Sequence, residues 1–90
     1  MISVNKFTSG EILAMNLKYY RYQLNMSQEK FAEMLGTTLP YINQLETNKR
    51  NPSLELIDRF AKCLNISSAE LLTYNPKHHI EKIRIDEREK

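Results

Sequence analysis

Apolar residues recur three and four positions apart along most of the chain, which is the spacing of amphipathic helices. The first such stretch covers residues 10–24, where Thr8 or Ser9 can cap the helix and Glu11 lies in its first turn. This stretch carries two apolar stripes, so we expect other parts of the protein to cover it from two sides. The first stripe holds Leu13, Leu17, Tyr20 and Leu24, and the second holds Ile12, Met15, Tyr19 and Tyr22.

Two short helices are predicted next, separated by a three-residue turn. Ser27 is a good N-cap for the first of them, which runs to about Leu35. Gly36 follows at the position where a left-handed glycine ends a helix. Thr38 can cap the second helix, which ends near Thr47.

Two further helices are predicted before the C-terminal segment. Ser53 can cap one that closes at Asn65. Ser67 and Glu70 have the spacing of a capping box at the start of the other, and Pro76 is expected to stop it. Residues 76–90 are ambiguous, because two of their isoleucines alternate as in a strand and two are spaced as in a helix. The pattern predicts an all-α fold with an arm (1–8), a helical domain (9–75) and a charged tail (76–90).

Composition excludes several classes of protein. The 90 residues carry a net charge of +2, which permits nucleic-acid binding without arguing for it. No apolar run is long enough to cross a membrane, no secretory signal is visible, and one cysteine forms no internal disulfide. These features predict a cytoplasmic protein without a membrane partner.

Candidate metal-binding and catalytic residues are few. Cys63 is expected to be a small packing residue, and His78 and His79 to lie in a solvated tail, because none has partners at ligand spacing. We find no clustered set of titratable residues that would support turnover. We therefore expect no metal, no cofactor and no enzymatic activity.

The third predicted helix has an unusual polar face. Within "GTTLPYINQLETNK", the inward positions are Ile42 and Leu45. The opposite face carries no charge and holds Pro40, Tyr41, Asn43, Gln44 and Thr47. A glycine-containing turn between two short helices is typical of a helix-turn-helix, whose second helix lies in the major groove of DNA. Amide side chains suit that place because they pair with base edges, and apolar groups can touch thymine methyls.

The stretch "SQEKFAEMLGTTLPYINQLETNKRNPS" resembles the phage-repressor-like helix-turn-helix regulators of the Cro/C1, or Xre, type. The resemblance covers about residues 17–72, and "AELL" completes its pattern. It implies a compact, lambda-repressor-like five-helix domain that binds operator DNA as a symmetric dimer.

The resemblance also assigns roles to individual residues. Gln28 would reach a phosphate and brace the recognition helix, and Gln44 is the strongest candidate for a base contact. Leu39 could pack on a thymine methyl or fold back to the core. The full set of expected DNA-binding residues is Gln28, Thr38, Leu39, Pro40, Tyr41, Asn43, Gln44, Thr47, Asn48, Lys49 and Arg50.

Two charged residues border the core and are expected to be structural. Arg21 and Glu46 lie beside the apolar stripes of their helices, where unpaired charges would be costly. The family pairs an arginine and a glutamate at these places, which predicts a partly buried salt bridge. Dimers of the family often form through the fifth helix, so the candidates for that contact are Ile66, Leu71, Leu72 and Tyr74. The second stripe of the first helix could be covered by the arm or the tail, or could join the dimer contact.

These observations predict a sequence-specific DNA-binding regulator. Its partners would be double-stranded DNA and a second copy of the chain, and it would act as a dimeric repressor of a pseudo-palindromic operator. The alternative is a protein-interaction module, such as an antitoxin, whose main partner is a protein. A mobile element, a restriction–modification system and a toxin–antitoxin operon are all compatible settings.

Overall fold

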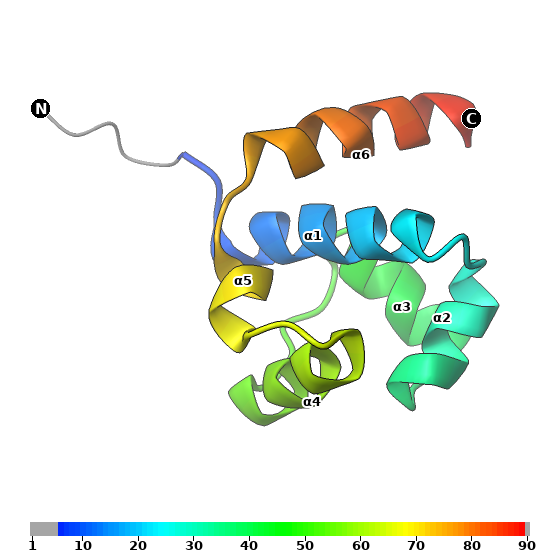
Figure 1. Cartoon of the computed structure of the whole chain (residues 1–90), viewed down its shortest axis with the longest axis vertical. Coiled ribbons are helices and arrows are strands. Elements are labelled where there is room, and N and C mark those ends of the chain that lie inside the picture. Colours follow the sequence, from blue (N-terminus) through cyan, green and yellow to red (C-terminus); the bar gives the residue numbers. More distant parts are fainter. Residues whose placement is uncertain (1–5, 90) are drawn as a thin grey trace, which may run out of the picture.

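The computed structural model describes residues 6–89. The regular secondary structure of this part of the chain consists of α-helices joined by short turns and loops (Figure 1). Its elements are α1 (Ser9–Gln23), α2 (Gln28–Leu35), α3 (Leu39–Glu46), α4 (Leu54–Leu64), α5 (Ser68–Leu72) and α6 (Pro76–Arg88). Within these residues no helix is both long and apolar enough to cross a membrane. The expected arm lies partly outside the described residues, but Phe7 stacks on Tyr74 with ring centroids 5.3 Å apart.

Helix α1 lies at the centre of the fold. It packs against α3 and α5 on one side and against α6 on the other (Figure 1). The core cluster joins Leu13 and Leu17 of α1 to Phe31, Ile42 and Phe60 of the next three helices. The second stripe of α1 is also covered, since Ile12 and Met15 are buried. The C-terminal segment, one of the three coverings expected for this stripe, packs against it as α6.

Helix ends follow the chemistry of the sequence. Thr8 is the N-cap of α1 and forms a capping box with Glu11, and Ser67 does the same with Glu70 at α5. Side chains of Ser27, Thr38 and Ser53 accept hydrogen bonds from the first turns of α2, α3 and α4. Left-handed residues at Asn25, Gly36, Asn48 and Asn65 follow the first four helices. These caps fix the ends of α2 and α3, and therefore the geometry of the turn between them.

The C-terminal segment differs from the expectation of a tail. Pro76 does not stop α5, which already ends at Leu72; it instead occupies the first turn of α6, where a missing N–H has no helical partner to lose. Helix α6 runs along α1 in the same direction (Figure 1). It buries Ile85 and His78, so the fold has a sixth helix and His78 is not solvated.

Buried polar groups attach α6 and α5 to α1. Asn16 of α1 donates from Nδ2 to the carbonyl oxygens of Glu70, Leu71 and Thr73, which close α5. Its Oδ1 lies 2.7 Å from Nδ1 of His78, whose ring stacks on Tyr19. The Asn16 amide therefore hydrogen-bonds both the last carbonyl groups of α5 and a side chain in the first turn of α6.

Candidate nucleic-acid interface

Helices α2 and α3 form a helix-turn-helix whose turn is fixed by side chains from elsewhere in the fold. Gly36 has φ 73°, the left-handed conformation that glycine adopts without strain. Arg59 of α4 donates from Nη2 to the carbonyl oxygens of Gly36 (3.2 Å) and Leu35 (3.5 Å). These carbonyls belong to the end of α2 and would otherwise lack a helical donor. Arg59 therefore positions the turn, although its exposed place in α4 gave no signal in the sequence.

The outer face of α3 carries no charge. Leu39, Pro40 and Asn43 are exposed, while Tyr41 and Gln44 are half-buried. Leu39 keeps 43% of its surface exposed, so it faces solvent rather than the core. Thr38 is also exposed, but its hydroxyl accepts from Tyr41 N as the cap of α3. This face can contact bases through an amide, a ring and apolar groups, and it does not repel DNA.

Gln44 and Arg50 are joined on this surface. Nε of Arg50 donates to Oε1 of Gln44 over 2.7 Å, and its guanidinium lies 5.2 Å from the ring centroid of Tyr41. This hydrogen bond fixes the orientation of the Gln44 amide relative to the loop after α3. A bidentate contact with adenine needs the oxygen as well as the nitrogen. The oxygen has a second lone pair, so Gln44 can still accept from a base while Arg50 holds its side chain in place.

A buried ion pair supports α3 from below. Nε of Arg21 lies 2.7 Å from Oε2 of Glu46, and Nη2 lies 3.0 Å from Oε1, so the predicted pair is present and bidentate. The two side chains are 4% and 0% exposed, which is a deeper burial than expected. Burial alone would lower the pKa of Arg21, but hydrogen bonds to Glu46 and its charge outweigh burial and raise it. The pair ties α1 to the last turn of α3.

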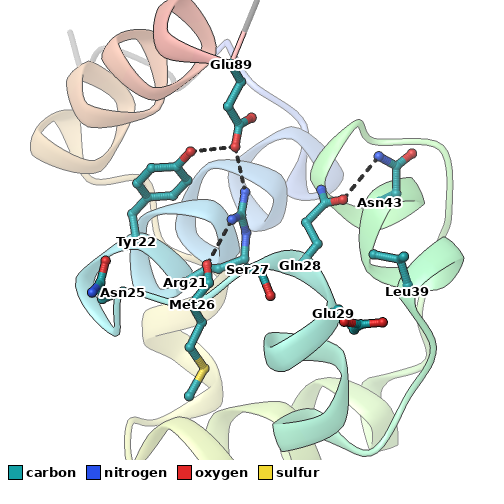
Figure 2. A pocket seen from close by; sticks show the side chains of 10 residues that line it. All are labelled: Arg21, Tyr22, Asn25, Met26, Ser27, Gln28, Glu29, Leu39, Asn43 and Glu89. Carbon is teal, nitrogen blue, oxygen red and sulfur yellow. Dashed lines mark hydrogen bonds and ion pairs between the residues drawn. The ribbon is translucent and has the colours of Figure 1, made fainter.

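Gln28 links this ion pair to the surface, and Figure 2 shows its contact with Asn43. Its Nε2 donates to Oε1 of Glu46 over 3.0 Å, and its Oε1 accepts a long hydrogen bond, 3.5 Å, from Asn43 Nδ2. The side chain therefore braces α3, which is one of the two roles expected of it. A line of polar contacts thus runs from Arg21 in the core to Asn43 on the exposed face.

The loop after α3 carries the local positive charge. Thr47, Asn48, Lys49 and Arg50 are all exposed. Thr47 Oγ1 donates to Asn43 O, and Lys49 N donates to Gln44 O over 2.7 Å, so the loop is fixed to the end of the helix. Asn48 approaches α1 so closely that a Cβ on Gly10 would lie 2.3 Å from its Oδ1. Lys49 and Arg50 are therefore held beside the uncharged face of α3.

The four dimer candidates and Cys63 differ in how far they are buried. Leu71 has no exposed surface and lies in the core, so it offers no side chain to a dimer partner. Ile66 and Leu72 pack partly on the core, and Tyr74 is half-buried against Phe7. Cys63 is exposed and is not the packing residue expected from its position. Within residues 6–89 no group of three or more potential ligands could hold a metal ion.

Two short helices joined by a fixed turn, with an uncharged outer face on the second and cations after it, define a helix-turn-helix DNA-binding protein. A family model described as helix-turn-helix matches residues 17–71. The chain belongs to this family, in its Cro/C1 (Xre) type, and it is a DNA-binding transcriptional regulator.

Individual relatives support the same assignment. Control protein C.SmaI of Serratia marcescens is 44% identical over 63 residues, which is 70% of this chain and 75% of that protein. The restriction-modification controller C.AhdI from Aeromonas hydrophila is similar in structure, with a TM-score of 0.64 and 29% identity over 72% of this chain and 98% of that one. A hypothetical transcription factor from Neisseria shares the fold with a TM-score of 0.70, at 23% identity over 90% of this chain and 95% of that one. None of these names indicates a protein-interaction module.

Proposed function

We propose that this protein is a homodimeric repressor that reads a pseudo-palindromic operator with α3 and controls a restriction–modification gene set. The observation that carries the proposal is the exposed, uncharged face of α3 with Lys49 and Arg50 fixed at its end. The names of C.SmaI, a control protein, and C.AhdI, a restriction-modification controller, support the setting. Occupation of the operator would exclude the transcription machinery from the promoter.

Base reading belongs to the outer face of α3. Gln44 and Asn43 carry amides on this face, and Leu39 presents an apolar group at the tip of the helix. Amide donors recognise acceptor atoms in the major groove, and the leucine suits a thymine methyl. Pro40 and Tyr41 add contacts of shape, and Thr38 keeps the tip in register by capping it.

Backbone binding belongs to the residues around this face. Lys49 and Arg50 supply positive charge, and Thr47 and Asn48 supply polar groups on the same loop. Gln28 lies in the first turn of α2, where backbone N–H groups favour a phosphate. These contacts would fix the orientation of α3 without carrying sequence information.

A dimer places two α3 helices on successive turns of DNA. Half-sites of such a dimer are separated by about 34–36 Å, one helical turn of the duplex. Ile66 and Leu72 are the two aliphatic candidates that retain exposed surface near α5. Sedimentation of the wild type and of Leu72→Glu tests this surface, since a charge there should shift the dimer toward monomer.

Selection of binding sites from a random duplex library at physiological salt tests the function. The wild type should enrich a two-fold symmetric sequence, because base contacts survive salt that weakens phosphate contacts. Gln44→Ala should relax the preference at defined positions in each half-site. Gln23→Ala, which removes the same amide from an exposed position of α1, serves as the matched control and should leave the preference intact. Binding that is salt-sensitive and sequence-blind would overturn the proposal.

A further inference from the structure

An open groove lies between the α1–α2 turn, the first turn of α2 and the recognition helix α3 (Figure 2). Tyr22, Asn25 and Gln28 line it, together with Asn43 from the exposed face of α3. Glu89, which follows the last residue of α6, also lines it. A carboxylate from the far end of the chain therefore stands in a groove that continues the proposed DNA-binding surface.

Three donors converge on the Glu89 carboxylate. Tyr22 donates from its hydroxyl to Oε2 over 2.6 Å, and Arg21 donates from Nη2 to the same oxygen over 3.1 Å. Nζ of Lys18 lies 2.9 Å from Oε1. Burial alone would raise the pKa of Glu89, but the hydrogen bonds from Tyr22, Lys18 and Arg21 lower it to about 2. The carboxylate is therefore fully ionised near neutral pH, and the donors around it form a site for an anion.

Positive charge gathers around Tyr22 in particular. The Arg21 guanidinium lies 4.7 Å from the centroid of the Tyr22 ring, and that of Arg88 lies 5.6 Å away. Glu46 already balances the charge of Arg21 inside the core, and Asp86 lies 2.6 Å from Nζ of Lys18. If Glu89 left the groove, Lys18 and Arg21 would each keep a carboxylate partner. The Tyr22 hydroxyl, with Arg88 beside its ring, would then be open to another anionic oxygen.

A phosphodiester oxygen and a carboxylate oxygen make the same demand on these donors, since both are anionic acceptors. The groove also contains Gln28, at the N-terminus of α2, where a phosphate is favoured. We infer that this groove is a binding site for a backbone phosphate of DNA, which the Glu89 carboxylate occupies while the protein is free. The inference rests on the proposed function, because it places the DNA backbone beside α3.

The competition needs little movement of α6. Ile85 is buried against α1, and Asp86 remains paired with Lys18 and Lys82. These contacts hold the helix one turn before Glu89, whose side chain is 36% exposed. Displacement of this side chain alone frees the groove. The last turn of α6 thereby lowers the affinity for DNA without contributing to sequence preference.

The salt dependence of DNA binding tests the inference. Binding of the wild type, Glu89→Gln and Glu81→Gln is measured by fluorescence anisotropy, on the selected operator and on an unrelated duplex of equal length, between about 50 and 200 mM salt. Glu81→Gln is the matched control, because it removes the same charge from α6 at a residue that pairs with Arg84 and does not line the groove. Thermal unfolding confirms that each variant is folded at the assay temperature.

Glu89→Gln removes one carboxylate charge from Lys18 and Arg21, so one more positive charge at the groove can neutralise a phosphate, which should steepen the slope of log K against log salt by about 0.9. We expect this change for Glu89→Gln on both duplexes, with affinity at low salt higher by up to about fivefold, the size of an exposed ionic contact. Tyr22→Phe in the Glu89→Gln background should lower the affinity on both duplexes, because it removes a hydroxyl donor that the phosphate uses, and it should leave the steeper slope in place. Glu81→Gln should leave the slope unchanged.

Two results would overturn the inference. Glu89→Gln could show the slope of Glu81→Gln, or it could bind both duplexes less tightly than the wild type; either would make Glu89 a structural residue alone. Failure of the proposed function gives a different signature, in which the wild type shows no preference for the operator. Even then the slopes on the unrelated duplex decide whether Glu89 competes with phosphate.

Discussion

Replacing Arg21 by alanine would leave the Glu46 carboxylate buried with one remaining side-chain donor, Gln28. Arg21 also donates to the carbonyl oxygen of Met26 and to Glu89, so the change removes these two contacts as well as the ion pair with Glu46. Breaking one side of a buried ion pair costs about 3–5 kcal/mol, because the other charge loses its solvation and its partner. A small domain loses about 4–8 °C in Tm per kcal/mol, so Tm should fall by at least about 12 °C.

Urea unfolding followed by circular dichroism measures this loss. Arg84→Ala is the matched control, since Arg84 pairs with Glu81 over 3.1 Å while 68% of its side chain is exposed. That pair should contribute less than about 1 kcal/mol. Replacing Arg21 by methionine and Glu46 by leucine together should recover most of the stability, because neither side chain of the pair then carries a buried charge. If Arg21→Ala cost no more than Arg84→Ala, the reasoning about the buried pair would be refuted.

Two further changes test the packing of α6 and the turn of the helix-turn-helix. Burial, followed by the charge of Lys77, lowers the pKa of His78, so the unfolded chain binds a proton that the fold does not. The free energy of unfolding should therefore have its full value above the unfolded-state pKa of about 6.5, and it should fall as the pH drops below that value. Urea midpoints measured on both sides of that pH should differ in the wild type and converge in His78→Gln; a flat wild-type profile would contradict this account. Gly36→Ala should cost about 1–2 kcal/mol in unfolding free energy, because φ is 73° although the nearest atom to a new Cβ is 3.8 Å away. Gly36→Asn should cost less, and an Ala variant as stable as the wild type would count against backbone strain.

Local signals in the sequence were sufficient for the helix-turn-helix. Caps at Ser27 and Thr38, and a left-handed residue at Gly36, act over a few residues and can be read from neighbouring positions. The Arg21–Glu46 pair was also predictable, because two charges bordered apolar stripes and the family resemblance paired them. The exposed position of Leu39 could not be decided in advance, since a leucine at a helix tip fits either a core or a groove.

The packing of α6 depended on contacts that no local pattern contains. Two of the isoleucines with helical spacing in residues 76–90, Ile80 and Ile83, are each 52% exposed, while Ile85 and the polar His78 are buried. The helix is attached largely by hydrogen bonds and ion pairs to residues of α1 more than sixty positions away, such as Asn16 and Lys18. Periodicity identifies apolar faces, so a helix attached by polar contacts appears in the sequence as a charged tail. The role of Glu89 in the groove was hidden for the same reason.

The central claim is that α3 reads bases while the loop after it binds the backbone, and one set of equilibrium constants tests it most directly. Every base pair of a selected half-site is substituted in turn, and binding is measured for the wild type, Gln44→Ala and Lys49→Ala. Gln44→Ala should abolish discrimination at one or two positions, worth about 1–3 kcal/mol there. Lys49→Ala should weaken binding equally for all sequences and reduce the salt slope by about one. Uniform weakening by Gln44→Ala, with discrimination retained at every position, would contradict a reading role for α3.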